Sequence, residues 1–426
     1  MDNRIQALCE YLDASHSAYH AQANLVAILK EQGYTQLTES AGWELVPGGK
    51  YFVCRGGAAV IAFRIPHSIP RGFLISAAHT DRPCFKVKEN GEQVGAYTRL
   101  LTEVYGGALL APWTDRPLSI AGRVMVETEN GAQARLFDID RDLLLIPNVA
   151  IHMNRQANDG AKWNPAVDTI PLLGGKDAKG KFAQLLEETA GGKVLGHDLY
   201  LYVRQKASVW GIDEEFISSP ALDDLQSVWG TFQGFLTAGE GGDIPVFCAL
   251  NSEEIGSRTT GGADSTILSD VLGRICAGCN LDLRQLLSQS FMISADNAHA
   301  VHPNHPELAD AANAPVMGQG VVLKFNANQR YCTDGLCAAV FRKVCAKAGV
   351  NVQTYYNRPD IPGGSTLGCI SISHVTVPTA DIGLPQLAMH SCYETASVAD
   401  SIAMIDAMAA YFGSTLELSE EGFKLI

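Results

Sequence analysis

The residues with the clearest capacity for chemistry are two adjacent carboxylates, Glu253 and Glu254. They follow an apolar run at 246–250 that is typical of a buried strand, and Gly256 closes the turn after them. Adjacent side chains point in different directions, so the two carboxylates cannot share one task. Burying paired glutamates is costly unless a cation or a substrate compensates their charge. One carboxylate could therefore bind a metal while the other faces a reacting water; the alternative is a solvated loop at a strand end.

Several other ionisable residues lie where a strand-like run or a helical pattern begins or ends. They are His79, Asp81, Asp223, Asp296 and His390. In α/β proteins, sites collect outside the carboxyl ends of sheet strands. We therefore expect these side chains to converge with the two glutamates on one pocket.

Histidines combined with carboxylates, and without cysteine, are the ligand set of a catalytic zinc or a similar divalent ion, because structural zinc sites favour thiolates. Two ions need a shared anion to offset their repulsion, and one aspartate can bridge them. Asp81 follows closely after His79 and could accept its other ring N–H, which would fix the tautomer. Each residue also has an ordinary structural reading, as a helix cap, a turn residue or a buried histidine. Their coincidence at element ends favours a metal centre.

The elements that must position these residues alternate between strand and helix in two stretches, 1–87 and 216–426. Predicted strands lie at 73–78, 246–250, 291–295, 321–325 and 352–356, and predicted helices at 5–12, 225–236, 333–348 and 397–412. Between the two stretches, residues 88–215 are predicted to form a β-rich insertion with hairpin turns at Asn90-Gly91 and Asn130-Gly131. The predicted fold class is α/β: a mixed sheet flanked by helices and interrupted by a separate β-rich domain.

Composition narrows the function classes. The 426 residues are 46% apolar and 18% charged, and the net charge of −14 with no basic run argues against nucleic acid or an anionic membrane as a partner. No apolar signal core or membrane-length stretch is present, so a cytoplasmic protein is expected. The 11 cysteines lack a disulfide-like spacing, which fits reduced thiols. Cys276 and Cys279 form a lone C-x-x-C, which is read as structural.

Several short runs resemble the aspartyl aminopeptidase family, the M18 metallopeptidases, in a bacterial-type form. They lie at 79–81, 151–155, 219–224, 251–257, 294–304, 363–368 and 389–391. The resemblance runs in order over nearly the whole chain, and the run 294–304 (Ser-Ala-Asp-Asn-Ala-His-Ala-Val-His-Pro-Asn) is highly specific. One departure is Arg82, where the family commonly has serine.

The resemblance implies a dinuclear zinc aminopeptidase core interrupted by a dimerisation domain, with dimers that assemble into a hollow tetrahedral dodecamer. It implies two divalent ions per subunit, Zn²⁺ first, with Mn²⁺ or Co²⁺ possible. Matched by position, the metal ligands are His79, Asp223 as the bridge, Glu254, Asp296 and His390. Glu253 matches the general base, which takes a proton from water and returns it to the leaving amine.

The resemblance also implies the substrates, which are peptides with an acidic N-terminal residue. Lys324 matches the position that meets the acidic side chain, and Tyr331 a neighbouring substrate contact. His152 matches a residue that reaches into the neighbouring subunit's site and helps to stabilise the oxyanion. Apart from the family, Lys324 could be a surface lysine at a strand end, and His152 a zinc ligand or an ordinary loop histidine.

Three readings compete. The first is a two-metal aminopeptidase that prefers acidic N-terminal residues. The second is a related hydrolase with another substrate, such as a neutral-residue aminopeptidase, a carboxypeptidase or a deacylase, and Lys324 separates it from the first. The third is a non-catalytic scaffold, against which the intact Glu253 argues.

Overall fold

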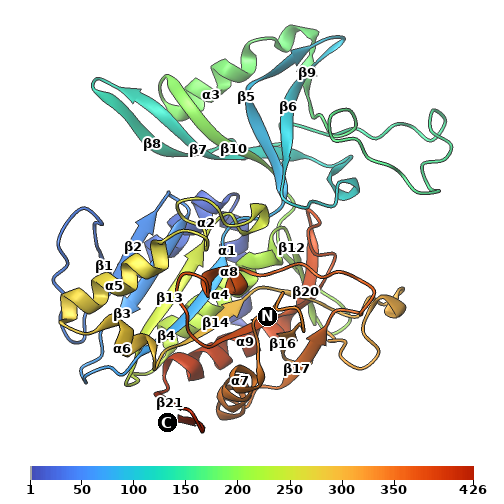
Figure 1. The fold of residues 1–426 in the computed structure, drawn as a ribbon. Helices are drawn as coiled ribbons and strands as arrows, with labels where there is room; N and C mark the ends of the chain where they lie inside the picture. Colours follow the sequence, from blue (N-terminus) through green and yellow to red (C-terminus); the bar gives the residue numbers. More distant parts are fainter. Residues whose placement is uncertain (1) are drawn as a thin grey trace.

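The computed structural model describes residues 2–426, which form an α/β body and a smaller β-rich part that stands on it (Figure 1). The body contains both ends of the chain. The β-rich part is formed by the middle of the sequence, drawn in blue to green at the top of Figure 1. The predicted fold class, a mixed α/β sheet with flanking helices, is confirmed.

The body is built on a nine-stranded mixed sheet. Its order is β1 (Thr35–Gln36), β2 (Lys50–Arg55), β3 (Ala59–Arg64), β13 (Ile244–Leu250), β4 (Phe73–His79), β14 (Phe291–Ala295), β18 (Thr379–Gly383), β16 (Val321–Phe325) and β17 (Val352–Tyr356). The central strands β13, β4, β14 and β18 run parallel, and every residue of β13 is buried. Continuous apolar runs such as β13 are what a sheet covered on both faces requires.

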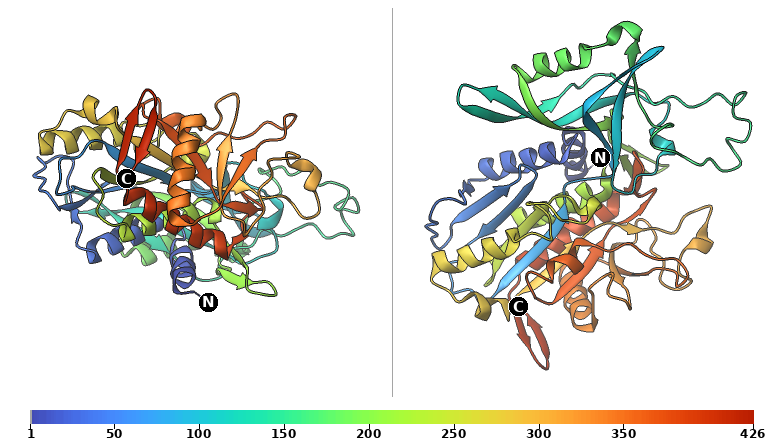
Figure 2. Two further views of the ribbon diagram at one scale, coloured as in Figure 1. Left: turned by 90° about the horizontal axis from the view of Figure 1, so that it is seen from below. Right: turned by 45° about the horizontal axis from the view of Figure 1, so that its top comes forward.

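Helices cover both faces of this sheet. One face packs against α1 (Asn3–Ala14), α2 (Ala18–Glu31), α4 (Leu222–Thr237), α7 (Gly335–Ala348) and α9 (Val398–Phe412). The other face packs against α5 (Ile267–Cys279), α6 (Leu283–Leu287) and α8 (Leu367–Ser371). In the right-hand view of Figure 2 the dark-blue N-terminal helices and the yellow helix α5 lie on opposite sides of the sheet. Two separate hydrophobic cores result, one on each face.

The β-rich part is a six-stranded sheet with one helix. Its order is β8 (Gly131–Asp138), β7 (Leu118–Thr128), β10 (Val194–Val203), β5 (Cys84–Val94), β6 (Tyr97–Tyr105) and β9 (Leu172–Gly175), and α3 spans Lys181–Ala190. A third hydrophobic core lies between this sheet and α3.

Two small sheets complete the body. The first joins β11 (Ser208–Trp210), β12 (Phe216–Ser219), β20 (Glu394–Ser397), β19 (Pro385–Leu387) and β15 (Ala298–His299). The second is the C-terminal hairpin of β21 (Leu416–Ser419) and β22 (Gly422–Leu425). The five-stranded sheet places residue 390, in the connection between β19 and β20, near the carboxyl ends of the parallel strands.

The elements predicted from hydrophobic spacing are confirmed, but the turn at Asn90-Gly91 is wrong. Strand β5 continues through these residues to Val94, and the hairpin turns only at 95–96. The pairing register shifts between Val87 and Glu92, so the asparagine and glycine occupy an irregularity within the strand pair. Glycine suits a strand irregularity as well as a turn, so the Asn90-Gly91 dipeptide alone could not distinguish the two.

The predicted limits of the insertion differ from the sheet boundaries. Strand β5 starts at Cys84, before residue 88, and β11 pairs with β12 of the body although it lies before residue 216. That 88–215 acts as a separate dimerisation domain remains a prediction. Among the described residues, none of the helices combines the length and apolar character needed to cross a membrane.

Candidate metal centre

The carboxyl ends of strands β4 and β13 lie side by side and carry the first residues of the site. His79 is paired in register with Leu250, so the segments that follow these two residues leave the sheet together. The buried Asp81 carboxylate accepts the backbone N–H groups of Glu253 at 3.0 Å and Glu254 at 3.2 Å. It also accepts the hydroxyl of Tyr105 at 2.8 Å. Asp81 therefore fixes the short turn that carries both glutamates.

His79 and His390 both direct their Nε2 atoms toward Asp223, because the Nδ1 atom of each ring is bound to a backbone carbonyl. His79 Nδ1 lies 3.1 Å from the carbonyl oxygen of Asp81, and His390 Nδ1 lies 3.0 Å from that of Gly107. A carbonyl accepts only an N–H, so in the neutral rings both Nε2 atoms keep their lone pairs. The sequence suggested that the Asp81 carboxylate would accept the His79 N–H. Its Oδ1 is 3.5 Å away, so the Asp81 backbone carbonyl is the nearer acceptor.

Asp223 lies between the histidines. Its Oδ1 is 3.4 Å from His79 Nε2 and its Oδ2 is 3.5 Å from His390 Nε2. His390 Nε2 is also 3.5 Å from Glu254 Oε2. Asp223 belongs to two groups whose ligand atoms lie within 4.8 Å of one another, one with His79, Asp224 and Asp296, and one with Glu254 and His390. The structure thus brings together all five residues that the resemblance gave as ligands.

Carboxylates dominate the electrostatics of this cluster. Burial raises the pKa of Glu253 to about 8 and raises the pKa values of Glu254 and Asp224 well above their ordinary values. Burial also raises the pKa of Asp296. At His79 burial opposes the charge, but the neighbouring carboxylates, Asp224 foremost, hold the pKa well above its ordinary value. Carboxyl groups crowded into one buried pocket keep some of their protons unless bound cations take the place of those protons.

The donor atoms fit divalent cations. Asp223 Oδ1, Asp224 Oδ1 and Glu254 Oε1 are buried and have no hydrogen-bond partner among residues 2–426. Buried polar atoms are nearly always paired, so three carboxylate oxygens without a hydrogen-bond partner in one cluster indicate that cations bind there. Imidazole and carboxylate donors without thiolates match the catalytic type of zinc site or a related ion.

Sequence reasoning missed a buried acid behind the cluster. Glu394 is 1% exposed, and its two carboxylate oxygens accept the backbone N–H groups of Asp223 at 2.9 Å and His390 at 2.8 Å. Burial raises the pKa of Glu394 well above its ordinary value. No apolar run precedes Glu394, so the sequence pattern that predicted the other site residues did not indicate this one. Asp224, at the start of α4, also faces the cluster and accepts the His79 backbone N–H at 3.1 Å.

Lys324 is buried, so its reading as a surface lysine is wrong. It is 2% exposed at the end of β16, and its Nζ donates to the carbonyl oxygens of Asp296 at 2.7 Å and Asn297 at 3.4 Å. Nζ also lies 3.9 Å from Asp296 Oδ2 and 5.1 Å from the ring centroid of Tyr331. A positive charge thus stands immediately beside the carboxylate cluster.

His152 lies away from the cluster, whereas Arg82 lines a small pocket together with Asp223 and Glu394. His152 is exposed on the long connection between β8 and β9, which projects from the β-rich part in Figure 1, and it joins none of the metal-ligating groups among residues 2–426. The Arg82 guanidinium donates to the carbonyl oxygens of Ser15, at 2.9 Å, and His16. Arg82 therefore ties the segment between α1 and α2 to the body.

An open cleft lies beside the connection that carries His390. Its lining includes His299, Tyr355, Gly363 and Ala388. Ala388 belongs to the connection that carries His390. Burial lowers the pKa of His299, and the nearby Asp223 carboxylate opposes this shift. A chain segment of a few residues has room to lie in this cleft.

Known proteins of one family match almost the full length of this chain. The profile of the family described as "Aminopeptidase I zinc metalloprotease (M18)" matches residues 11–412. A protein of Clostridium acetobutylicum named "Probable M18 family aminopeptidase 2" is 42% identical over 409 residues, which are 92% of this chain and 94% of the relative. One of the same name from Azotobacter vinelandii is 38% identical over 96% of this chain and 98% of its own length.

Solved structures agree on the fold. The structure described as "Cryo-EM structure of the Ape4 and Nbr1 complex" has a TM-score of 0.92 and 33% identity, and covers 96% of this chain and 85% of that chain. The "Structure of S. cerevesiae mApe1 dodecamer" has a TM-score of 0.84 at 24% identity, and covers 96% of this chain and 95% of the other.

Proposed function

Because the chain belongs to the M18 family of zinc aminopeptidases, we propose that it removes N-terminal residues from peptides with two divalent ions, and that it prefers Asp and Glu. The observation that carries the acidic preference is the buried ammonium of Lys324 beside the carboxylate cluster.

The proposed ligands are His79 and Asp296 for one ion and Glu254 and His390 for the other, with Asp223 shared. The orphaned oxygens of Asp223 and Glu254 and the inward Nε2 atoms of both histidines support this division. Divalent ions held there, Zn²⁺ in the first place, would lower the pKa of a water and polarise the scissile carbonyl. Asp81 positions the site by holding the glutamate turn and one histidine ring.

Glu253 is the proposed general base. Its backbone N–H is held by Asp81, while its carboxylate makes no hydrogen bond or ion pair within residues 2–426. It lies in the same group as His79 and Glu254, so it faces the reacting centre from one side. A free, partly buried carboxylate at this position can take a proton from the attacking water and return it to the departing amine.

Lys324 is the proposed partner of the acidic substrate side chain. An ammonium has three N–H donors, and the contacts with Asp296 and Asn297 use two of them. The third is left for a substrate carboxylate, with the Tyr331 ring beside it. A local cation is needed because the net charge of −14 repels such substrates at long range.

We further propose that the chain self-associates into dimers and a tetrahedral dodecamer. The connection between β8 and β9 exposes large apolar side chains that a partner would cover: Val149 at 55%, Ile151 at 48%, Met153 at 83% and Val167 at 64% exposure. A structural relative is described as a dodecamer. His152 lies among these residues, and we propose that it completes the site of a neighbouring subunit.

The test is a panel of reporter substrates with N-terminal Asp, Glu, Ala or Leu, assayed with the purified assembly. Acidic substrates are expected to be turned over fastest. A chelator should abolish turnover, and Zn²⁺, Mn²⁺ or Co²⁺ should restore it. Faster turnover of Ala or Leu would overturn the acidic preference, and chelator-resistant turnover would overturn the metal mechanism.

A further inference from the structure

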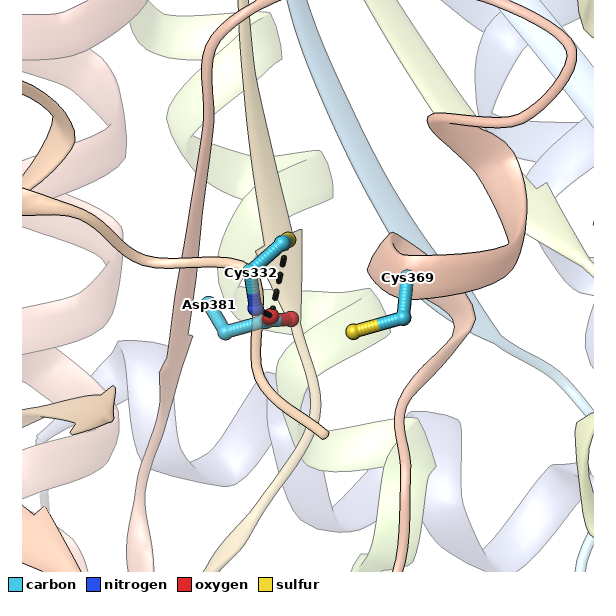
Figure 3. A group of neighbouring side chains, drawn as sticks. All are labelled: Cys332, Cys369 and Asp381. Carbon is cyan, nitrogen blue, oxygen red and sulfur yellow. Dashed lines mark hydrogen bonds between the residues drawn. The ribbon is translucent and has the colours of Figure 1, made fainter. Parts of the chain in front are cut away.

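Two cysteines and a buried aspartate meet outside the centre described above (Figure 3). Cys332 Sγ donates to Asp381 Oδ2 at 2.9 Å, and the Cys369 side chain points toward the same carboxylate. One ligand atom from each of the three residues lies within 4.8 Å of the other two. No step of the proposed peptidase reaction uses these side chains.

Three separate segments build this cluster. Cys332 lies between β16 and α7, Cys369 lies in α8, and Asp381 is the central residue of β18. Gly368 makes the close approach possible, because a Cβ at this position would lie 2.7 Å from Ser294 Oγ and 2.8 Å from Asp381 Oδ1. The missing side chain lets α8 pack directly on the carboxylate and brings the thiol of Cys369 beside it.

The charge of Asp381 lacks a counterion. The residue is fully buried, and no ion pair reaches it within residues 2–426. Its carboxylate oxygens are held only by neutral donors, which are the Cys332 backbone N–H, the Cys332 thiol and the Thr366 hydroxyl at 2.7 Å. Burial of a carboxylate without a cation in contact is expensive, so an ion bound directly to Asp381 would stabilise the cluster.

We propose that Cys332, Cys369 and Asp381 bind one thiophilic divalent cation of the Zn²⁺ or Cd²⁺ class, in a site distinct from the histidine–carboxylate centre. Two thiolates and a carboxylate are a soft donor set that such ions favour, whereas the neighbouring centre offers no sulfur. Binding releases the two thiol protons to solvent. The two thiolates and the aspartate then carry three negative charges against the two positive charges of the ion, so the net charge of the cluster stays at −1 while the carboxylate gains a cation in direct contact. Three protein ligands leave the fourth tetrahedral position to water.

Access and acidity fit this assignment. Cys332 is buried, but Cys369 is partly exposed, so an ion can enter from its side. Interaction with the Cys332 thiol lowers the pKa of Cys369, whereas the same interaction and burial raise the pKa of Cys332, so the ion must itself displace the proton of Cys332. An ion here would link α8 to the segment that carries Tyr331, and so would fix the loop beside Lys324.

The test loads the full-length, reduced assembly with Co²⁺ alone and records its absorption. Thiolate-to-cobalt charge transfer arises only where cysteine is a ligand, so ions at the histidine–carboxylate centre do not contribute to it. The wild-type protein is expected to show this band and to bind one ion per subunit more than Cys369→Ser. Cys332→Ser should also lose the band. Because Cys369 is partly exposed, its variant is the safer one for folding, which circular dichroism checks.

The matched control is Cys276→Ser, which disrupts the other close pair of cysteines, on α5, and should keep the band. The proposal is overturned if the wild-type protein gives no band, if Cys369→Ser retains it, or if Cys276→Ser loses it. It is also overturned if the metal-free protein, denatured without reductant, is lighter by two hydrogens than the fully reduced chain while Cys369→Ser is not, since Cys332 and Cys369 would then be joined as a disulfide.

Discussion

A carboxylate oxygen of Glu394 accepts the backbone N–H of Asp223 at 2.9 Å. The other oxygen accepts the backbone N–H of His390 at 2.8 Å, so one buried acid holds the proposed bridging ligand and a proposed terminal ligand at once. The two ligands come from distant parts of the chain, the start of α4 and the connection before β20. Glu394 is therefore a positioning residue, and its loss should loosen the site without removing a ligand.

Glu394→Gln should weaken metal binding. The amide offers one acceptor oxygen where the carboxylate offers two, so one of the two backbone N–H groups loses its partner. Loss of such a supporting contact typically lowers metal affinity about 10- to 100-fold. Competition against a chelator of known affinity measures the change. Glu420→Gln, at an exposed residue, is the matched control and should leave affinity unchanged. Equal affinities for both variants would contradict the positioning role.

Glu253→Gln and Glu254→Gln should fail in different ways although the residues are adjacent. Glu253→Gln should keep full metal content and lose activity by about 10²- to 10⁴-fold, as expected for a lost general acid–base. Glu254→Gln should lose metal, because Glu254 Oε2 lies 3.5 Å from His390 Nε2 within the cluster. Metal analysis and turnover are measured on the same samples. A metal-replete Glu253→Gln protein with normal turnover would reject the proposed base.

Lys324→Ala should lower kcat/KM for substrates with N-terminal Asp or Glu more than for those with Ala or Leu. The substitution removes a charge-assisted hydrogen bond to the substrate, so kcat/KM for acidic substrates should fall about 10- to 100-fold more than kcat/KM for neutral ones. The exposed Lys343→Ala is the control for a general change of charge and should leave the ratio unchanged. If Lys324→Ala slowed acidic and neutral substrates equally, Lys324 would support the fold of the site and not its selectivity.

Strand ends were the part of the site that the sequence could predict. His79, Glu253 and Asp296 all follow continuous apolar runs, and such runs are buried parallel strands whose carboxyl ends share one edge. The helices were equally accessible, because their apolar spacing is regular: α7 was expected at 333–348 and spans Gly335–Ala348.

Residues held by tertiary contacts left no such pattern. Glu394 is placed by backbone N–H groups from two distant segments, and the Cys332–Cys369–Asp381 cluster depends on a helix that packs at Gly368. The turn at Asn90-Gly91 failed for a related reason, since a local signal gave way to pairing with β6. Contacts between segments far apart in sequence are invisible to periodicity.

Removal of the metals should make stability fall as the pH rises. Burial raises the pKa of Glu253 from 4.5 to about 8, and carboxylates hold the pKa of His79 well above its ordinary value despite burial. Groups with a raised pKa bind protons more tightly when folded. Their stabilisation is complete below the unfolded pKa and is lost as the pH rises through the folded pKa. The Tm of the chelated protein should therefore decline from about pH 5 to about pH 8.

Metal-loaded protein should show a flatter Tm profile over the same range, because cations replace the protons. Differential scanning calorimetry with and without chelator compares the two forms. Glu253→Gln removes one of the titrating groups, so its chelated form should decline less steeply than the chelated wild type. A Tm of the chelated protein that rises through this window would contradict the sign of the effect.

His152 allows the proposed sharing of sites between subunits to be tested by complementation. His152→Ala and Glu253→Gln should each be inactive alone, because each lacks one side chain of every site. When both are expressed together, a subunit with intact Glu253 can receive His152 from its neighbour. Random pairing should then restore about a quarter of the wild-type activity. The control is co-expression of His152→Ala with the double variant, which can supply neither residue. Recovery no greater than in this control would place His152 outside the neighbouring site.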